Sequence, residues 1–143
     1  MSSHQAVTIL LVEDDAGHAR LIEKNLRRAG VSNGIIHLDN GQKAVDFLFA
    51  EEIANHLPLL ILLDLNMPVL DGYQVLSRIK ADERTKCVPV VMLTTTDNPQ
   101  EIARCYELGC NIYVTKPVEY EQFSEAIRNL GLFLSIVKVP DEA

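Results

Sequence analysis

The sequence has no excess of basic residues and no apolar run long enough to span a membrane. Of its 143 residues, 13 are Lys or Arg and 20 are Asp or Glu, which gives a net charge of −7. Proteins bind the nucleic-acid backbone through clustered basic residues, and no such cluster is present here. The N-terminal residues 1–6 contain neither the basic region nor the apolar segment of a secretion signal. We therefore expect a cytoplasmic protein that binds neither nucleic acid nor a membrane.

Several signatures of catalysis are also missing. The three cysteines, Cys87, Cys105 and Cys110, have no zinc-site spacing beside a pair of histidines. We interpret them as buried or half-buried thiols. The four histidines are scattered, and His18 is interpreted as a surface residue near the start of a helix. A Walker A loop, G-x-G-x-x-G, H-E-x-x-H and G-x-S-x-G are all absent.

The sequence does contain a regular alternation of short apolar runs and longer amphipathic ones. This alternation is typical of βαβ units around a parallel sheet, and the length suits one domain. Right-handed crossovers would place helices on both faces of the sheet. The expected strands are 8–12, 34–38, 59–63, 90–93 and 111–115, with 59–63 at the centre. The expected helices are 16–29, 41–50, 72–80, 99–108 and 119–130, and the apolar residues of the first include Ala19, Leu21, Ile22 and Leu26 at roughly helical spacing.

Four of these apolar strands end at polar residues whose side chains can take part in a reaction or bind an ion. The acids 13–15 follow the first strand, Asp64 the third, Thr94 the fourth, and Lys116 the fifth. In parallel α/β sheets the ligand lies outside the carboxyl ends of the strands. We therefore expect several carboxylates, one hydroxyl and one ammonium to share a pocket.

These groups suit phosphoryl transfer with a divalent cation. Clustered carboxylates raise each other's pKa unless a cation joins them, and Mg²⁺ prefers oxygen ligands. Acids near a helix N-terminus need no metal to explain them. Asp64 is different, because an aspartate that ends the most apolar strand serves no packing purpose. A carboxylate can attack a phosphoryl group, Lys116 can supply positive charge, and Thr94 can donate a hydrogen bond. The run 94–96 leaves the choice of a single threonine open.

The order and spacing of these motifs resemble the receiver domain of two-component response regulators. The matching segments are V-E-D-D (12–15), L-L-D-L-N-M-P (62–68), L-T-T (93–95) and Y-V-T-K-P (113–117). The resemblance covers about residues 7–130. It implies an α/β, doubly wound (βα)₅ flavodoxin-like fold with strand order 2-1-3-4-5.

The resemblance also implies ligands for Mg²⁺. Asp64 would be the phosphoacceptor and a metal ligand. Asp14 would bind the metal directly, Glu13 mostly through water, and Asn66 through its backbone carbonyl. Asp15 lies just past the usual acid pair and is expected only to add charge.

The same resemblance implies which residues would change conformation on phosphorylation. Thr94 and Lys116 would contact the phosphoryl group on Asp64. Tyr113, expected to be half-buried on the last strand, would turn inward as Thr94 moves toward the phosphate. A sensor histidine kinase would be the phosphoryl donor. The protein would catalyse only its own phosphorylation and dephosphorylation.

A narrower resemblance concerns small response regulators that partner cyanobacterial phytochromes. It rests on D-N-P-Q-E-I (97–102), Y-E-L-G (106–109) and G-L-F-L-S-I-V-K-V-P (131–140). It implies a phytochrome as a candidate kinase and a single receiver domain that signals by protein contact. The apolar C-terminal extension 131–143 either packs on its own domain or serves as a dimer arm, and we predict a homodimer.

Two other classes share part of this pattern. A phosphatase of the haloacid dehalogenase type also uses a strand-end aspartate and Mg²⁺, but it usually needs a second aspartate where this chain has Asn66. A pseudo-receiver that only binds partners would typically lack the phosphoacceptor or the lysine. This chain keeps both Asp64 and Lys116.

Overall fold

The computed structural model describes residues 7–28, 30–51, 59–95, 97–116, 121, 122 and 125. In this part of the chain five parallel strands form one sheet in the order β2-β1-β3-β4-β5, which confirms the predicted fold. The strands are β1 (Thr8–Val12), β2 (Ile35–Leu38), β3 (Leu59–Asp64), β4 (Val90–Thr94) and β5 (Ile112–Thr115). The helices are α1 (Ala16–Arg28), α2 (Gly41–Leu48), α3 (Gly72–Ala81) and α4 (Pro99–Glu107). Of the expected helix 119–130, only the helical residues Glu121, Gln122 and Glu125 are described.

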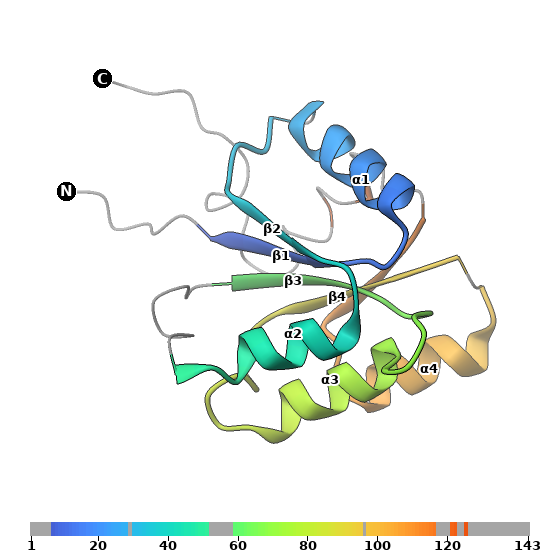
Figure 1. Ribbon diagram of the computed structural model, residues 1–143. Coiled ribbons are helices and arrows are strands. Elements are labelled where there is room, and N and C mark those ends of the chain that lie inside the picture. The colour runs from blue at the N-terminus through green and yellow to red at the C-terminus, as the bar shows by residue number, and fades with distance from the viewer. Residues whose placement is uncertain are drawn as a thin grey trace.

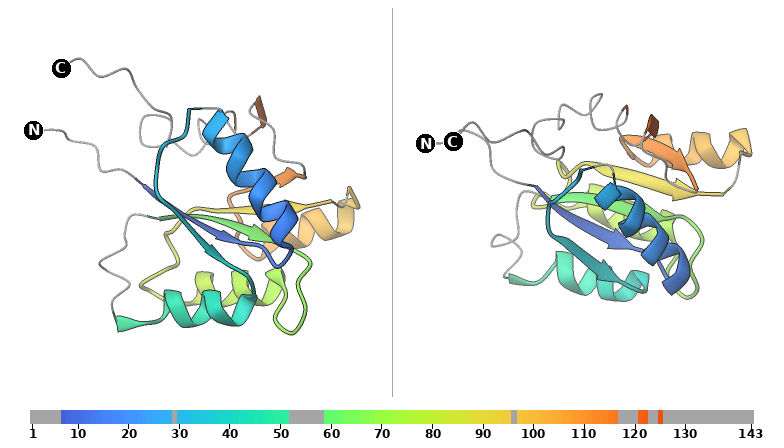
Figure 2. Two further views of the ribbon diagram at one scale, coloured as in Figure 1. Left: turned by 45° about the horizontal axis from the view of Figure 1, so that its top comes forward. Right: turned by 90° about the horizontal axis from the view of Figure 1, so that it is seen from above.

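The sheet is covered on both faces, as its continuous apolar strands predict. Helix α1 lies on one face, and α2, α3 and α4 lie on the other (Figure 1; Figure 2 shows the same arrangement from two more directions). Strand β3 is hydrogen-bonded to β1 and β4, and all six of its residues are buried. The expectation that this strand is central is therefore confirmed. No helix among the described residues combines the length and apolarity needed to cross a membrane.

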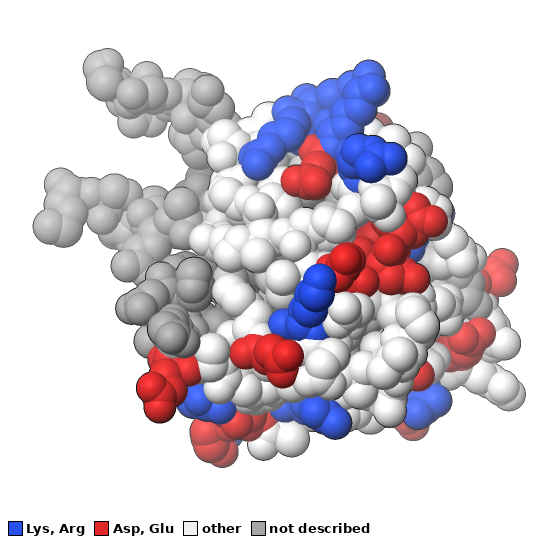
Figure 3. Space-filling model, in the orientation of Figure 1, with Lys and Arg blue, Asp and Glu red and all other residues white. Residues whose placement is uncertain are grey.

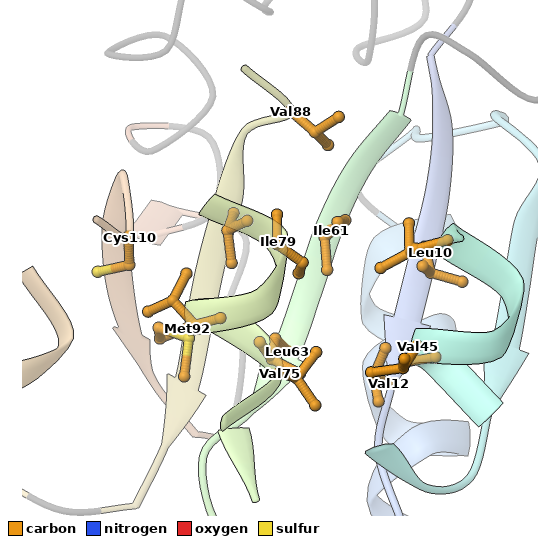
Figure 4. Packing of buried hydrophobic residues seen from close by; sticks show 14 of the residues in the cluster. Leu10, Val12, Val45, Ile61, Leu63, Val75, Ile79, Val88, Met92 and Cys110 are labelled. Carbon is orange, nitrogen blue, oxygen red and sulfur yellow. The ribbon is translucent and has the colours of Figure 1, made fainter. Parts of the chain in front are cut away.

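Alternate residues of the central strands divide the core into two layers. Leu60 and Leu62 face the layer under α1, whereas Ile61 and Leu63 face the layer under α2 and α3. Figure 4 shows Ile61 and Leu63 among the side chains of this second layer. Packing on both sides fixes β3, and with it the position of Asp64 at its end.

Two apolar or thiol side chains lie on the surface. Leu21 belongs to the apolar pattern of the first helix but is 45% exposed, because Ala19, Ile22 and Leu26 form the buried stripe of α1. At 100° per residue, Leu21 lies about 200° around the helix from Ala19. Cys87 is exposed, whereas the other two cysteines are buried as expected.

The start of α3 is fixed directly against the strand end that carries Asp64. Asp71 caps the helix in a capping box with Gln74, which suits the predicted start of this helix. The Gly72 N–H donates to the Leu65 carbonyl at 2.9 Å. A Cβ atom on Gly72 would lie 2.5 Å from the carbonyl oxygen of Asp64, so only glycine fits this close approach.

Candidate functional site

The polar strand-end residues lie together at the carboxyl edge of the sheet. Glu13 follows β1, Asp64 ends β3, Thr94 ends β4, and Lys116 follows β5. Glu13, Asp64 and Thr94 are buried, and the Lys116 side chain is 10% exposed. The Lys116 N–H donates to the Thr94 carbonyl at 2.8 Å, which extends the β4–β5 pairing into the site. The sheet therefore brings four residues from four strands into one place.

The Lys116 ammonium joins two of the buried acids. Its Nζ atom lies 2.5 Å from Glu13 Oε1 and 3.1 Å from Asp64 Oδ1. Charge-assisted hydrogen bonds of this kind are stronger than neutral ones, and a buried charge requires such partners. Burial alone lowers the pKa of Lys116, but its hydrogen bond to Glu13 and the charge of Asp64 outweigh this, and the pKa is raised. Lys116 is therefore a permanent positive charge beside Asp64.

One lysine does not neutralise two buried carboxylates. Burial, followed by repulsion from Glu13, raises the pKa of Asp64 to about 7, although Lys116 opposes this rise. The raised pKa means that Lys116 alone does not offset the cost of burying the Asp64 carboxylate beside Glu13. A second cation would relieve it.

Glu13, Asp14 and Asp64 form a group suited to such a cation. One carboxylate oxygen from each lies within 4.8 Å of the others. Oxygens on opposite sides of a Mg²⁺ ion are about 4.2 Å apart, so a small side-chain movement or one water would complete the geometry. Asn66 is exposed in the loop two residues after Asp64. The donor set is all oxygen and carries excess negative charge, so it fits Mg²⁺.

Acidic side chains mark this edge on the surface. Figure 3 shows acidic side chains gathered near the start of α1 and basic side chains over the rest of that helix. Asp14 and Asp15 are exposed there. The exposed basic residues of α1 are Arg20, Lys24, Arg27 and Arg28.

Asp15 has a structural role that differs from that of the other acids. Its carboxylate accepts a hydrogen bond from the His18 backbone N–H at 2.9 Å, which holds the pKa of Asp15 below its usual range. Its own N–H donates to Glu13 Oε2 at 3.2 Å. Asp15 thus organises the first turn of α1 and does not belong to the three-carboxylate group.

Two histidines contact the site although no sequence motif indicates their proximity. His37 Nε2 donates to the Glu13 carbonyl at 2.8 Å, because β2 pairs with β1 and places His37 beside Leu11. His18 is exposed, as expected, yet its Nδ1 atom lies 3.4 Å from Lys116 Nζ. No local motif could reveal either contact, since both depend on how separate elements pack.

The expected switch residues lie on neighbouring strands. Thr94 is the last residue of β4 and pairs with Thr115 of β5. Tyr113 is half-buried on β5, as predicted. Its ring meets Tyr106 of α4 edge to face, with 6.1 Å between centroids. Tyr113 therefore touches α4 on the side of the sheet away from α1.

The comparison with known families agrees with this fold and site. The family model of the response regulator receiver domain matches residues 9–128. The chain belongs to the receiver-domain family of response regulators. The response regulator Rcp1 of Synechocystis is 37% identical over 141 residues, which cover 96% of this chain and 96% of Rcp1.

Solved structures of relatives have the same fold. A response regulator receiver domain from Rhodospirillum rubrum is 52% identical, with a TM-score of 0.74 and coverage of 94% of this chain and 97% of that one. The phosphorylated cyanobacterial phytochrome response regulator RcpA is 35% identical, with a TM-score of 0.73 and coverage of 96% and 100%. The Mn²⁺-bound form of Rcp1 has a TM-score of 0.71, 37% identity and coverage of 94% and 99%. The narrower resemblance to small phytochrome-associated regulators is thus confirmed as homology.

Proposed function

We propose that the protein is a phosphorylation-dependent switch in which Asp64 accepts a phosphoryl group from a sensor histidine kinase. The observation that carries this proposal is the setting of Asp64. Its buried carboxylate ends the central strand, with Lys116 at 3.1 Å and two further acids within metal-binding distance. The excess negative charge around Asp64 would attract the cation that a phosphoryl transfer to this carboxylate needs.

The transfer is a displacement at phosphorus. An oxygen of Asp64 forms the new P–O bond while the P–N bond of the donor phosphohistidine breaks, and its electron pair returns to the imidazole nitrogen. Lys116 offsets the added charge, and Thr94 donates its hydroxyl to a phosphoryl oxygen. Burial of this strand end limits access of water to the acyl phosphate.

Mg²⁺ is the proposed cofactor. Asp14, Asp64 and the Asn66 carbonyl would hold it directly, and Glu13 would act mostly through water. When bound, the ion neutralises charge on the phosphoryl oxygens and on the acceptor. The Mn²⁺-bound structure of Rcp1 supports a divalent cation in a relative of this chain.

Thr94 and Tyr113 would change conformation in response to the phosphoryl group. Movement of Thr94 toward the phosphate leaves room for Tyr113 to turn inward, away from Tyr106. Phosphorylation shifts the population only because one conformation binds the phosphoryl group better. The altered surface includes α4 and β5, and output is by protein contact.

Partners and assembly follow from the relatives. Because the relative RcpA is a cyanobacterial phytochrome response regulator, a phytochrome is a candidate kinase for this chain. We propose a single receiver domain in the cytoplasm, with the extension 131–143 as a homodimer arm. That extension lies outside the described residues. Light scattering at high micromolar concentration, with and without a phosphate mimic, tests the dimer, and a monomer under both conditions contradicts it.

The phosphoacceptor is tested with the full chain, Mg²⁺ and acetyl phosphate. Intact-mass spectrometry should show a gain of one phosphoryl group, and beryllofluoride should change the NMR spectrum around Thr94 and Tyr113. Asp64→Asn should abolish both effects. No mass gain in the wild-type chain, or a gain that persists in Asp64→Asn, would overturn the proposal.

A further inference from the structure

We propose that His18 is a positioning residue for Lys116: its Nδ1 atom accepts the third N–H of the ammonium and sets its direction in the site. This inference rests on the proposed role of Asp64 as phosphoacceptor. It concerns a residue of α1 that belongs to none of the strand-end motifs.

The number of acceptors matches the number of donors. A lysine ammonium has three N–H groups and no acceptor. Among the described residues, the side-chain atoms around Lys116 Nζ are Glu13 Oε1 at 2.5 Å, Asp64 Oδ1 at 3.1 Å and His18 Nδ1 at 3.4 Å. Two of these partners are carboxylates that the metal would also engage. His18 is the third partner and is outside the metal-binding group.

The proposed contact requires one form of the imidazole ring. Lys116 can only donate, so Nδ1 would have to accept, and the ring would carry its proton on Nε2. The distance from Nδ1 to Glu13 Oε2 is 3.9 Å, too long for a hydrogen bond. The Lys116 ammonium is therefore the polar partner of Nδ1 among these groups.

The backbone of α1 holds His18 in this place. The His18 N–H donates to Asp15 Oδ1, and Ala19 anchors the first turn in the core. The His18 side chain is 52% exposed. With Leu21, Ile22, Thr95 and Lys116 it lines a cavity of about 300 Å³ at the strand ends. The imidazole is thus half exposed beside the largely buried Lys116 side chain.

Removing the His18 acceptor changes which hydrogen bonds the Lys116 ammonium makes. The ammonium would keep only its two carboxylate partners and would shift toward them. Closer pairing neutralises Asp64 and competes with the metal, so phosphorylation becomes slower. We expect a three- to tenfold decrease in rate, which is about the factor that one modest hydrogen bond contributes.

The test compares two substitutions of different chemistry. His18→Leu removes the acceptor and keeps an apolar side chain. His18→Asn keeps an acceptor, because the asparagine Oδ1 occupies nearly the same place as Nδ1. Lys24→Leu, on the exposed face of the same helix, is the matched control. Initial phosphorylation rates are measured by intact mass with acetyl phosphate and Mg²⁺.

We expect His18→Leu to be three- to tenfold slower, whereas His18→Asn and Lys24→Leu stay within about twofold of wild type. Thermal unfolding should be unchanged in all three variants. Equal rates for His18→Leu and wild type, or equal loss in His18→Leu and His18→Asn, would overturn the role of His18.

A second measurement is independent of phosphorylation. The side-chain ammonium of Lys116, assigned by its loss in Lys116→Arg, is followed by ¹⁵N NMR without metal. Its signal should be retained in His18→Asn and broadened by faster proton exchange in His18→Leu. If wild type is not phosphorylated at all, the proposed function fails, and this signal still decides whether His18 binds Lys116. An unchanged signal in His18→Leu refutes the contact.

Discussion

The guanidinium of Arg104 on α4 lies over the ring of Tyr73 on α3, with its Cζ atom 4.0 Å from the ring centroid. The Tyr73 hydroxyl also donates to the Glu101 carbonyl at 3.3 Å. Cys105 is the buried residue of α4, so this helix has little apolar anchoring of its own. Tyr73 directly follows Gly72, and it therefore connects the loop after Asp64 with α4.

The stacking of Arg104 on Tyr73 should contribute measurably to stability. Arg104→Ala is expected to lower the free energy of unfolding by about 0.5–1 kcal/mol, the usual value of a partly exposed cation–π contact. Urea denaturation measures this change. Arg78→Ala, at an exposed position of α3, is the control and should stay within about 0.5 kcal/mol of wild type. Equal effects of the two substitutions would mean that the stacking contributes nothing.

The raised pKa of Asp64 predicts how stability depends on pH without metal. An unfolded aspartate has a pKa of about 3.9, and the folded value is about 7. Between these values the folded state binds more protons, so stability falls as the pH rises. Asp64→Asn removes this penalty and should stabilise the protein at pH 8 by on the order of 2 kcal/mol.

Denaturation of wild type and of Asp64→Asn from pH 4 to pH 8 tests this predicted loss of stability. The difference between Asp64→Asn and wild type should shrink toward pH 4 and should also shrink when Mg²⁺ is added at pH 8. Asp97→Asn, at an exposed acid, should show no such trend. A constant difference at every pH would contradict the raised pKa.

The same ionisation predicts the pH dependence of Mg²⁺ binding. The proposed Mg²⁺ site uses Asp64 as a carboxylate, so a proton must leave wherever Asp64 is protonated. The apparent Kd should rise by up to about tenfold for each pH unit below 7 and level off above it. Isothermal titration calorimetry between pH 5.5 and pH 8.5 measures this. An affinity that does not vary across this range would exclude Asp64 as a ligand that titrates near neutrality.

The close approach at Gly72 predicts a strong effect of one methyl group. Gly72→Ala should lose about 1–3 kcal/mol, because the new Cβ would overlap the Asp64 carbonyl. Gly34→Ala is the matched control, since a Cβ there meets nothing within 4 Å. It should be neutral or slightly stabilising. Thermal unfolding of the two variants compares them, and similar melting temperatures would contradict the predicted clash.

Much of this fold could be predicted because its signals are local. The continuous apolar run before Asp64 marks a strand covered on both faces, and Asn98-Pro99 marks the start of α4, where the Asn98 side chain accepts from the Gln100 N–H. The strand ends then meet at one edge for topological reasons alone. The strand order itself came from the resemblance to a known family.

The parts that were missed depend on contacts between distant segments. Leu21 fits an apolar helical pattern only roughly, and the exact phase of the buried stripe is set by packing under α1. Cys87 lies in the turn before β4, where composition does not determine exposure. His18 and Lys116 are 98 positions apart in the chain, and only the packing of α1 beside β5 brings them together.

The position of Asp64 in the sheet also determines its distance from the residues at the ends of the other strands. Strand β3 is bonded to β1 on one side and to β4 on the other. Neighbouring strands are about 4.8 Å apart, so Glu13, which follows β1, and Thr94, which ends β4, each lie about one strand spacing from Asp64. An acceptor on β2 or β5, at the margin of the sheet, would have a neighbour on one side only. A charge placed at Asp64 therefore acts at similar range on Glu13 and on the strand that leads to α4.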